Sequence, residues 1–176
     1  ARRAAAVPPP PLIWGGDLNV AAAWEDVGPD PSWFREKNGQ GHAPKDCGQP
    51  GFTPAEQERF AELLLAGDLL DAVRLTHPEP DWRRDVTWRG TPGAPPNPPE
   101  FGRYYGKGMR IDYVLLERPL TSRLVRTEVL GRGFEREGFV GSDHCPLLLE
   151  LSAVEAAAAE GAANEPAASA VAACAP

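Results

Sequence analysis

Three short stretches of this sequence place acids, an amide or an imidazole beside strongly apolar segments. They are "GDLNV" with Asp17 and Asn19, "RIDYVLL" with Asp112, and "GSDHCP" with Asp143 and His144. Carboxylate and amide oxygens suit Mg²⁺, which keeps several waters and takes few protein ligands. An imidazole held by a carboxylate can contact a phosphate or stabilise developing negative charge. Taken together, the stretches predict metal-assisted phosphoryl chemistry.

Each stretch also has a purely structural interpretation. An isolated DxN is more often a turn device, and Asp112 could bond a neighbouring backbone amide or an arginine. Ser142, before Asp143, could cap a loop. The functional interpretation therefore depends on the combination.

The elements that must position these side chains can be read from periodicity. Residues 12–14 predict a short buried strand, and alternation after it places Asp17 and Asn19 on one side. Residues 21–52 predict a long loop rich in Gly, Pro and Asp, which in a compact domain is usually functional or disordered.

Residues 53–67 predict the clearest helix. Thr53 is the expected N-cap, Pro54 suits the first helical position, Glu56 completes a capping box, and Gly67 ends the helix. A second short turn, capped by Asp68, is expected to carry Leu69, Leu70 and Val73 into the core.

Strands are expected at "DVTWRG", "MRIDYVLL", "LVRTEVL" and "PLLLEL". In "MRIDYVLL", alternation puts Ile111, Tyr113 and Leu115 on one face and Arg110, Asp112 and Val114 on the other. An acid within so apolar a strand is costly without a partner. The element order suits a layered α/β fold with a mixed or antiparallel sheet.

Composition limits the fold to one domain within the 176 residues, of which 42% are hydrophobic. Residues 1–11 predict a Pro/Ala-rich linker, 12–151 the folded part, and 152–176 an Ala-rich disordered tail. Cys47, Cys145 and Cys174 lack the spacing of a disulfide framework or a zinc site. No apolar run approaches the roughly 20 residues of a membrane span, so a soluble protein without a membrane partner is expected.

The net charge of -7 argues at first against a nucleic-acid partner. The charge is uneven, however, because residues 82–136 hold eleven basic and six acidic residues, a local charge of +5. A basic surface there could bind phosphate, although ordinary solvated strand faces explain it equally well.

The blocks "GDLNV", "RIDYVLL" and "GSDHCP", in this order and spacing, resemble the exonuclease III class of apurinic/apyrimidinic endonucleases. This class belongs to the endonuclease/exonuclease/phosphatase superfamily, and "GQPGFTPAEQERF" resembles the class itself. The resemblance implies an α/β (α+β) fold: the C-terminal half of a four-layered, two-sheet β-sandwich flanked by helices, deoxyribonuclease I-like.

The resemblance also implies roles for individual residues. Asp17 would orient or deprotonate the attacking water, supported by Asn19, while His144 would contact the scissile phosphate. Asp112 would hydrogen-bond His144 and fix its orientation, as carboxylates beside metal sites do. The implied metal is Mg²⁺, with Mn²⁺ as the alternative, at Asp143 with Asp17, Asn19 and His144.

The implied partner is double-stranded DNA with an abasic site, bound by a monomer. Trp88, Met109 and Ile111 match positions that wall a pocket for an extruded abasic sugar. Plain core is an equally good interpretation of Trp88 and Ile111. Backbone phosphates would be contacted by Arg110 and by the loop that contains Arg35, Lys37 and Asn38.

Two features depart from the family pattern. Ala22 stands where members often have His after "GDLNVA". Only "ARRAAAV" precedes "PPPPLIW", so we expect a partial chain that lacks the half supplying an asparagine, a metal-binding glutamate and a tyrosine. Such a chain would be incomplete as a catalyst, with one apolar face uncovered.

The expected function of the complete protein is Mg²⁺-dependent hydrolysis of DNA on the 5′ side of abasic sites, in base excision repair. One alternative is another superfamily phosphodiesterase or phosphatase, such as a deadenylase or an inositol-phosphate hydrolase. The other is a non-catalytic DNA-binding fragment. The substrate suggests the nucleus, with an organelle as the alternative.

Overall fold

The computed structural model describes residues 9–37, 43–91, 96–131 and 142–153. Most of the predicted linker (1–11) and tail (152–176) lies outside these residues. The described part combines short helices with antiparallel strands, which agrees with the α/β prediction. The helices are α1 (Pro54–Gly67), α2 (Ala72–Thr76) and α3 (Trp82–Asp85), with 3-10 or π turns η1 (Trp24–Asp26), η2 (Trp33–Lys37), η3 (Pro44–Asp46), η4 (Pro99–Phe101) and η5 (Arg118–Arg123).

The strands form two three-stranded sheets and one two-stranded ladder, with neighbours antiparallel throughout the described residues. The first sheet has the order β1-β6-β3, the second β2-β5-β4, and the ladder pairs β7 with β8. Their bounds are β1 (Ile13–Asp17), β2 (Val27–Gly28), β3 (Leu69–Asp71), β4 (Trp88–Arg89), β5 (Gly108–Met109), β6 (Asp112–Glu117), β7 (Leu124–Val129) and β8 (Leu147–Leu151).

Local signals in the sequence define α1. The Thr53 side chain accepts a hydrogen bond from the Glu56 backbone N–H, and the Glu56 carboxylate accepts one from the Thr53 N–H at 3.0 Å, so the capping box is confirmed. The helix ends at Gly67 as predicted. Asp68 follows with a left-handed backbone (φ 46°) and is therefore the C-cap of α1.

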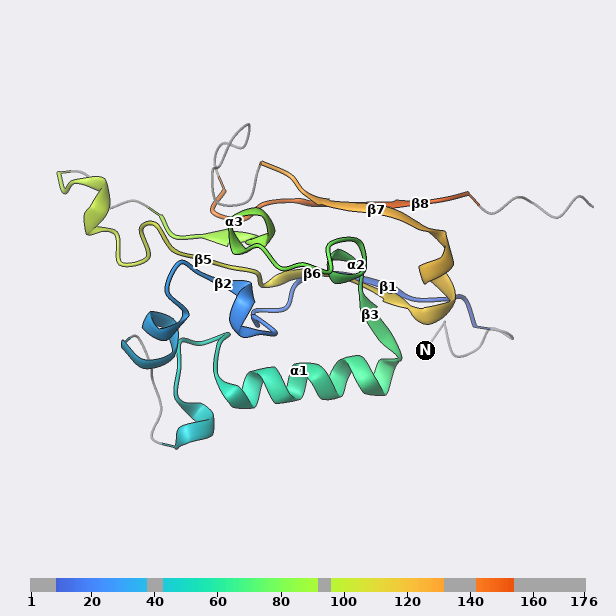
Figure 1. The fold of residues 1–176 in the computed structure, drawn as a ribbon, viewed down its shortest axis with the longest axis horizontal. Coiled ribbons are helices and arrows are strands. Elements are labelled where there is room, and N and C mark those ends of the chain that lie inside the picture. Colours follow the sequence, from blue (N-terminus) through green and yellow to red (C-terminus); the bar gives the residue numbers. More distant parts are fainter. Residues whose placement is uncertain (1–8, 38–42, 92–95, 132–141, 154–176) are drawn as a thin grey trace, which may run out of the picture.

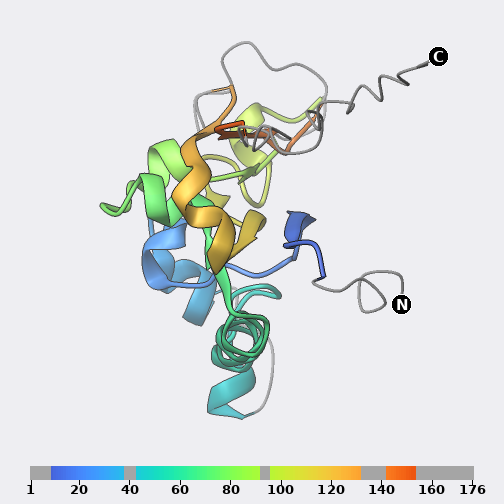
Figure 2. The same cartoon turned by 90° about the vertical axis from the view of Figure 1, so that its right-hand side faces the viewer.

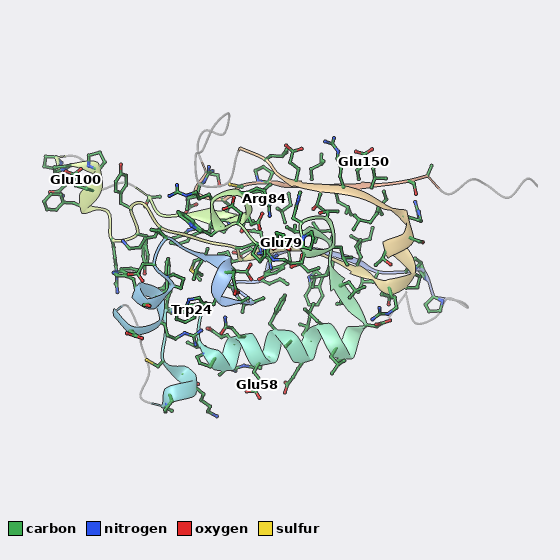
Figure 3. The ribbon with its side chains drawn as sticks, in the orientation of Figure 1. Trp24, Glu58, Glu79, Arg84, Glu100 and Glu150 are labelled. Atoms are coloured by element: carbon green, nitrogen blue, oxygen red, sulfur yellow. The ribbon has the colours of Figure 1, made fainter. Side chains whose placement is uncertain are left out.

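The first sheet lies between α1 and the β7–β8 ladder, as Figure 1 shows, and the turned view of Figure 2 separates α1 from the strands in the same way. Alternation along β6 builds this layering. Tyr113 and Leu115 pack with Phe60 of α1, whereas Val114 and Leu116 pack with leucines of β7 and β8. The predicted faces of this strand are confirmed for these residues, and Glu58 points from α1 away from the sheet (Figure 3).

The predicted buried strand at residues 12–14 is wrong in its bounds and its burial. The strand β1 begins at Ile13, and the side chains of Ile13 and Trp14 are 46% and 39% exposed. The reason is topological: β1 is an edge strand of its sheet and pairs only with β6 among the described strands. Composition alone could not distinguish this edge from an interior position.

The predicted turn capped by Asp68 is also wrong. Leu69–Asp71 form β3, which pairs with β6, and the cap of the following helix α2 is Asp71. The predicted loop at 21–52 contains β2 and several short helical turns instead of uninterrupted coil. No helix in the described residues has both the length and the apolar content that crossing a membrane requires.

Candidate functional site

The centre of the candidate site is a contact between Asp112 and His144. The imidazole Nδ1 of His144 lies 2.9 Å from Oδ2 of Asp112, and the two side chains are 33% and 15% exposed, respectively. The contact predicted between these residues is therefore present. It explains how Asp112 is tolerated at the start of β6, because the carboxylate has a hydrogen-bonding partner.

Backbone pairing with β4 positions His144. The Cys145 N–H donates to the Thr87 carbonyl at 2.6 Å, and the Arg89 N–H donates to the Asp143 carbonyl at 2.8 Å. A β-bridge joins Trp88 to His144 between these two bonds. Residues 143–145 therefore run antiparallel beside β4, joined to it by this isolated bridge.

Thr87, the residue before β4, positions Asp112. The buried hydroxyl oxygen of Thr87 accepts hydrogen bonds from the backbone N–H groups of Ile111 and Asp112, both at 3.0 Å. Thr87 consequently contacts the segments of both members of the Asp112–His144 pair.

Asp17 is brought beside Asp112 by strand register. The two residues are directly opposite in the antiparallel pairing of β1 with β6. Both oxygens of the Asp17 carboxylate accept hydrogen bonds from Asn19, one from its backbone N–H (2.8 Å) and one from its side-chain amide (3.0 Å). Asn19 has a left-handed backbone (φ 52°), so Asp17 and Asn19 form one polar turn that is exposed to solvent.

Asp143 faces a different neighbour. Its Oδ2 accepts a hydrogen bond from the indole Nε1 of Trp88 at 3.1 Å. Strand register and hydrogen bonds therefore link Asp17, Asn19, Asp112 and His144, whereas the side chain of Asp143 is bound to Trp88.

The side-chain oxygens at this end of the sheet are chemically suited to a hard divalent cation. Asp17, Asn19 and Asp143 present oxygens that Mg²⁺ prefers, and Mg²⁺ needs few of them. Within the described residues, however, no three His, Cys, Asp or Glu side chains cluster closely enough to hold a metal ion. The donor chemistry fits the expected cation, while the described residues alone do not complete a site.

Met109 and Ile111 belong to a buried cluster. They are 3% and 7% exposed and pack with Val27, Phe34 and Phe52. Trp88 is half-buried and packs against the same cluster. This placement favours the core interpretation given above for Ile111, and Met109, which was expected only in the pocket, lies in the same buried cluster.

The expectation that Arg110 contacts backbone phosphates conflicts with its position. Arg110 is 1% exposed, and its guanidinium donates to Asp26 at 2.7 Å and to Asp71 at 2.6 Å. Burial by itself lowers the pKa of Arg110, but the neighbouring Asp71, Tyr113 and Asp26 outweigh burial and raise that pKa above its usual value. The side chain is a charged internal link between carboxylates, so it is not presented to DNA.

The other expected phosphate contacts receive little support. Asn38 and the side chain of Lys37 lie outside the described residues. Arg35 stacks on the ring of Phe52, with its guanidinium carbon 4.4 Å from the ring centroid, and donates to Gln57 at 2.8 Å. Trp24, labelled in Figure 3, contacts the same ring of Phe52, so Arg35 is part of an aromatic cluster.

The sequence interpretation missed a buried network of ion pairs behind the site. The Asp26 carboxylate forms ion pairs with Arg110 and Arg74, and Arg74 also forms an ion pair with Asp85. The only local signal was the occurrence of acids and arginines near apolar residues, and this pattern does not specify partners so far apart in the chain.

Comparison with curated proteins finds close relatives over most of the chain. A protein of Arabidopsis thaliana described as DNA-(apurinic or apyrimidinic site) endonuclease is 46% identical over 145 residues, 81% of this chain and 37% of that protein. A protein of Plasmodium falciparum with the same description is 34% identical over 149 residues, 80% of this chain and 24% of that protein. The chain thus spans well under half the length of these relatives.

Solved structures show the same fold. NExo from Neisseria, described as a 3′ phosphatase bound to product DNA hairpin, matches with a TM-score of 0.56 and 26% identity, over 86% of this chain and 49% of that chain. The AP endonuclease LMAP from Leishmania major matches with a TM-score of 0.53 and 24% identity, over 81% and 35% of the two chains, and shows likeness of fold only. No model of a known protein family matches the chain. The deoxyribonuclease I-like fold class predicted from the sequence is confirmed.

Proposed function

Because this chain belongs to the family of apurinic/apyrimidinic endonucleases related to exonuclease III, we propose that the complete protein hydrolyses the DNA backbone on the 5′ side of abasic sites. The products would be a 3′ hydroxyl and a 5′ sugar phosphate. The observation that carries the proposal is the Asp112–His144 pair, with Asp17 directly opposite Asp112 in the strand register.

Each residue of the pair and the turn would have a distinct role. Asp17 would orient the attacking water and accept its proton, and Asn19 would hold the Asp17 carboxylate through the two hydrogen bonds described above. His144 would stabilise negative charge on the phosphate, with its ring orientation fixed by Asp112.

The proposed cation is Mg²⁺, with Mn²⁺ as the alternative, held by Asp143 with Asp17, Asn19 and His144 as further candidates. When bound, it would stabilise charge on the phosphate oxygens as a Lewis acid. The oxygen donors of the turn and of Asp143 support this choice of metal.

The activity is proposed for the complete protein because the relatives are much longer than this chain. The exposed apolar side chains of Ile13 and Trp14 on the edge strand β1 support the expectation that further protein covers this face.

The test uses a duplex with one abasic site, in Mg²⁺ and in EDTA. The chain is assayed alone and mixed with the part of the Arabidopsis relative that it does not match, and that part is also assayed alone. We expect incision only in the mixture and only with Mg²⁺. No incision in any sample, from a chain shown to be folded, would favour the non-catalytic DNA-binding alternative.

A second candidate activity is removal of a 3′ phosphate at the same site. It is favoured by the likeness to the Neisseria protein described as a 3′ phosphatase. A duplex with a 3′-phosphate end, used in the same mixture, separates the two activities by comparison of their rates.

A further inference from the structure

The hydroxyl of Tyr113 connects the central strand β6 to the turn that carries Asp17 and Asn19. Its O–H donates to the Val20 carbonyl at 2.7 Å, with the Arg110 carbonyl as a more distant acceptor at 3.3 Å, and its oxygen accepts from the Ala22 N–H at 3.1 Å. Val20 directly follows Asn19, so one side chain of β6 binds the backbone on the far side of the polar turn.

The ring of Tyr113 is fixed in place by its surroundings. Tyr113 is 0% exposed, and its ring centroid lies 4.7 Å from that of Phe60. The Arg110 guanidinium carbon lies 4.5 Å from the same centroid, on a side chain held by Asp26. Burial raises the pKa of Tyr113 above its usual value, so the hydroxyl keeps its proton as a donor.

The turn itself needs external support. Asn19 has a left-handed backbone, which asparagine adopts at lower cost than other non-glycine residues, and its two hydrogen bonds to Asp17 hold the turn only from within. The Leu18 N–H donates to the Ile111 carbonyl at 2.9 Å on one side, and the Ala21 N–H donates to the Gly51 carbonyl at 2.7 Å on the other. Tyr113 binds the backbone at Val20, between these two bonds, and at Ala22, just beyond them, while the Gln57 side chain donates to the Ala21 carbonyl.

We propose that Tyr113 is a positioning residue whose hydroxyl holds the left-handed turn at Asn19, and thereby keeps Asp17 and Asn19 opposite Asp112. The effect of Tyr113 on catalysis rests on the proposed function, whereas its support of the turn at Asn19 does not. The hydroxyl acts through Val20 and Ala22 and has no contact with the reacting atoms.

The first test is amide hydrogen exchange in the 176-residue chain. In the unaltered chain, the Ala22 amide should be protected to a degree comparable with the Leu115 amide of β6. Exchange of Ala22 at the rate of an open loop would overturn the proposal, and this measurement needs no variant.

The second test compares Tyr113→Phe, which removes only the hydroxyl, with Tyr105→Phe at an exposed tyrosine (46% exposed). Tyr113→Phe should accelerate Ala22 exchange about tenfold more than Leu115 exchange, and Tyr105→Phe should change neither. Equal acceleration of both amides would show that the hydroxyl supports only global stability, and would overturn the positioning role.

The third test uses incision by the mixture described above. Tyr113→Phe should lower kcat about tenfold with little change in KM, because the turn is misplaced while DNA contacts remain. A local change in exchange with an unchanged kcat would overturn the catalytic part of the proposal. Absence of incision by the unaltered mixture would instead count against the proposed function, and the exchange data would still decide the structural link.

Discussion

His144 donates through Nδ1 to Oδ2 of Asp112 at 2.9 Å, across a separation of 32 residues. A carboxylate can only accept, so the proton of this hydrogen bond belongs to the imidazole, and Nε2 is the ring atom directed away from Asp112. The contact therefore fixes both the tautomer and the orientation of a partly exposed ring. This is the property that a phosphate-contacting histidine requires.

Replacement of Asp112 by asparagine should lower kcat of the mixture by about 100-fold, because the neutral amide does not balance positive charge on the imidazole and, with its NH₂ donor, no longer selects one tautomer. Single-turnover incision of an abasic duplex measures the effect. Asp46→Asn, at an exposed position in η3, is the matched control and should have full activity. A rate for Asp112→Asn within threefold of the unaltered mixture would exclude a role for this contact.

Removal of the Asp143 carboxylate should abolish most activity through the metal. Asp143→Ala is expected to need a far higher Mg²⁺ concentration for half-maximal incision. Trp88→Phe removes the indole donor to Asp143, together with part of the ring that packs near Tyr104, and should produce a smaller shift in the same direction. An unchanged Mg²⁺ concentration for half-maximal incision by Asp143→Ala, with unchanged activity, would refute the assignment of Asp143 to the metal.

Arg110→Met should lower the free energy of unfolding by about 3–5 kcal/mol, because it leaves the half-buried Asp71 without its Arg110 partner and the buried Asp26 with Arg74 alone. The comparison is Arg118→Met, which breaks an exposed pair with Asp68 and should cost less than about 1 kcal/mol. Urea unfolding followed by circular dichroism gives both values. Equal costs for the two variants would contradict the internal role of Arg110.

Asp85 should make stability fall in acid. Burial by itself raises the pKa of Asp85, but hydrogen bonds from Arg84 and Arg74 and from the Asp81 backbone outweigh it, so the pKa lies below its usual value. Stabilisation from a depressed carboxyl pKa is complete above the unfolded value of about 3.9, and is lost as pH falls through the folded value.

The measurement for Asp85 is the urea midpoint between pH 6 and pH 2.5, in the unaltered chain and in Asp85→Asn. The difference in stability between the two chains should be constant above about pH 4 and shrink at lower pH. A difference that stays constant to pH 2.5 would show that Asp85 does not contribute to the acid transition.

The sequence by itself determined the elements whose signals are local. The helix α1 follows from Thr53, Pro54 and Glu56, since a capping box involves residues only three positions apart. The faces of β6 follow from alternation, which depends only on the pleat of the strand. The motif blocks, read as a resemblance, also identified the family and the Asp112–His144 contact.

Tertiary structure alone decided which charged and apolar side chains are buried. Arg110 is internal because Asp26 and Asp71, which are 84 and 39 residues away in sequence, both bind its guanidinium. The residues next to Arg110 in the sequence do not indicate these two partners. The apolar Ile13 is exposed because β1 lies at the edge of its sheet. Whether a side chain is buried, and with which charge it pairs, depends on the residues packed around it. The topology of the fold determines those neighbours, and local sequence patterns do not specify the topology.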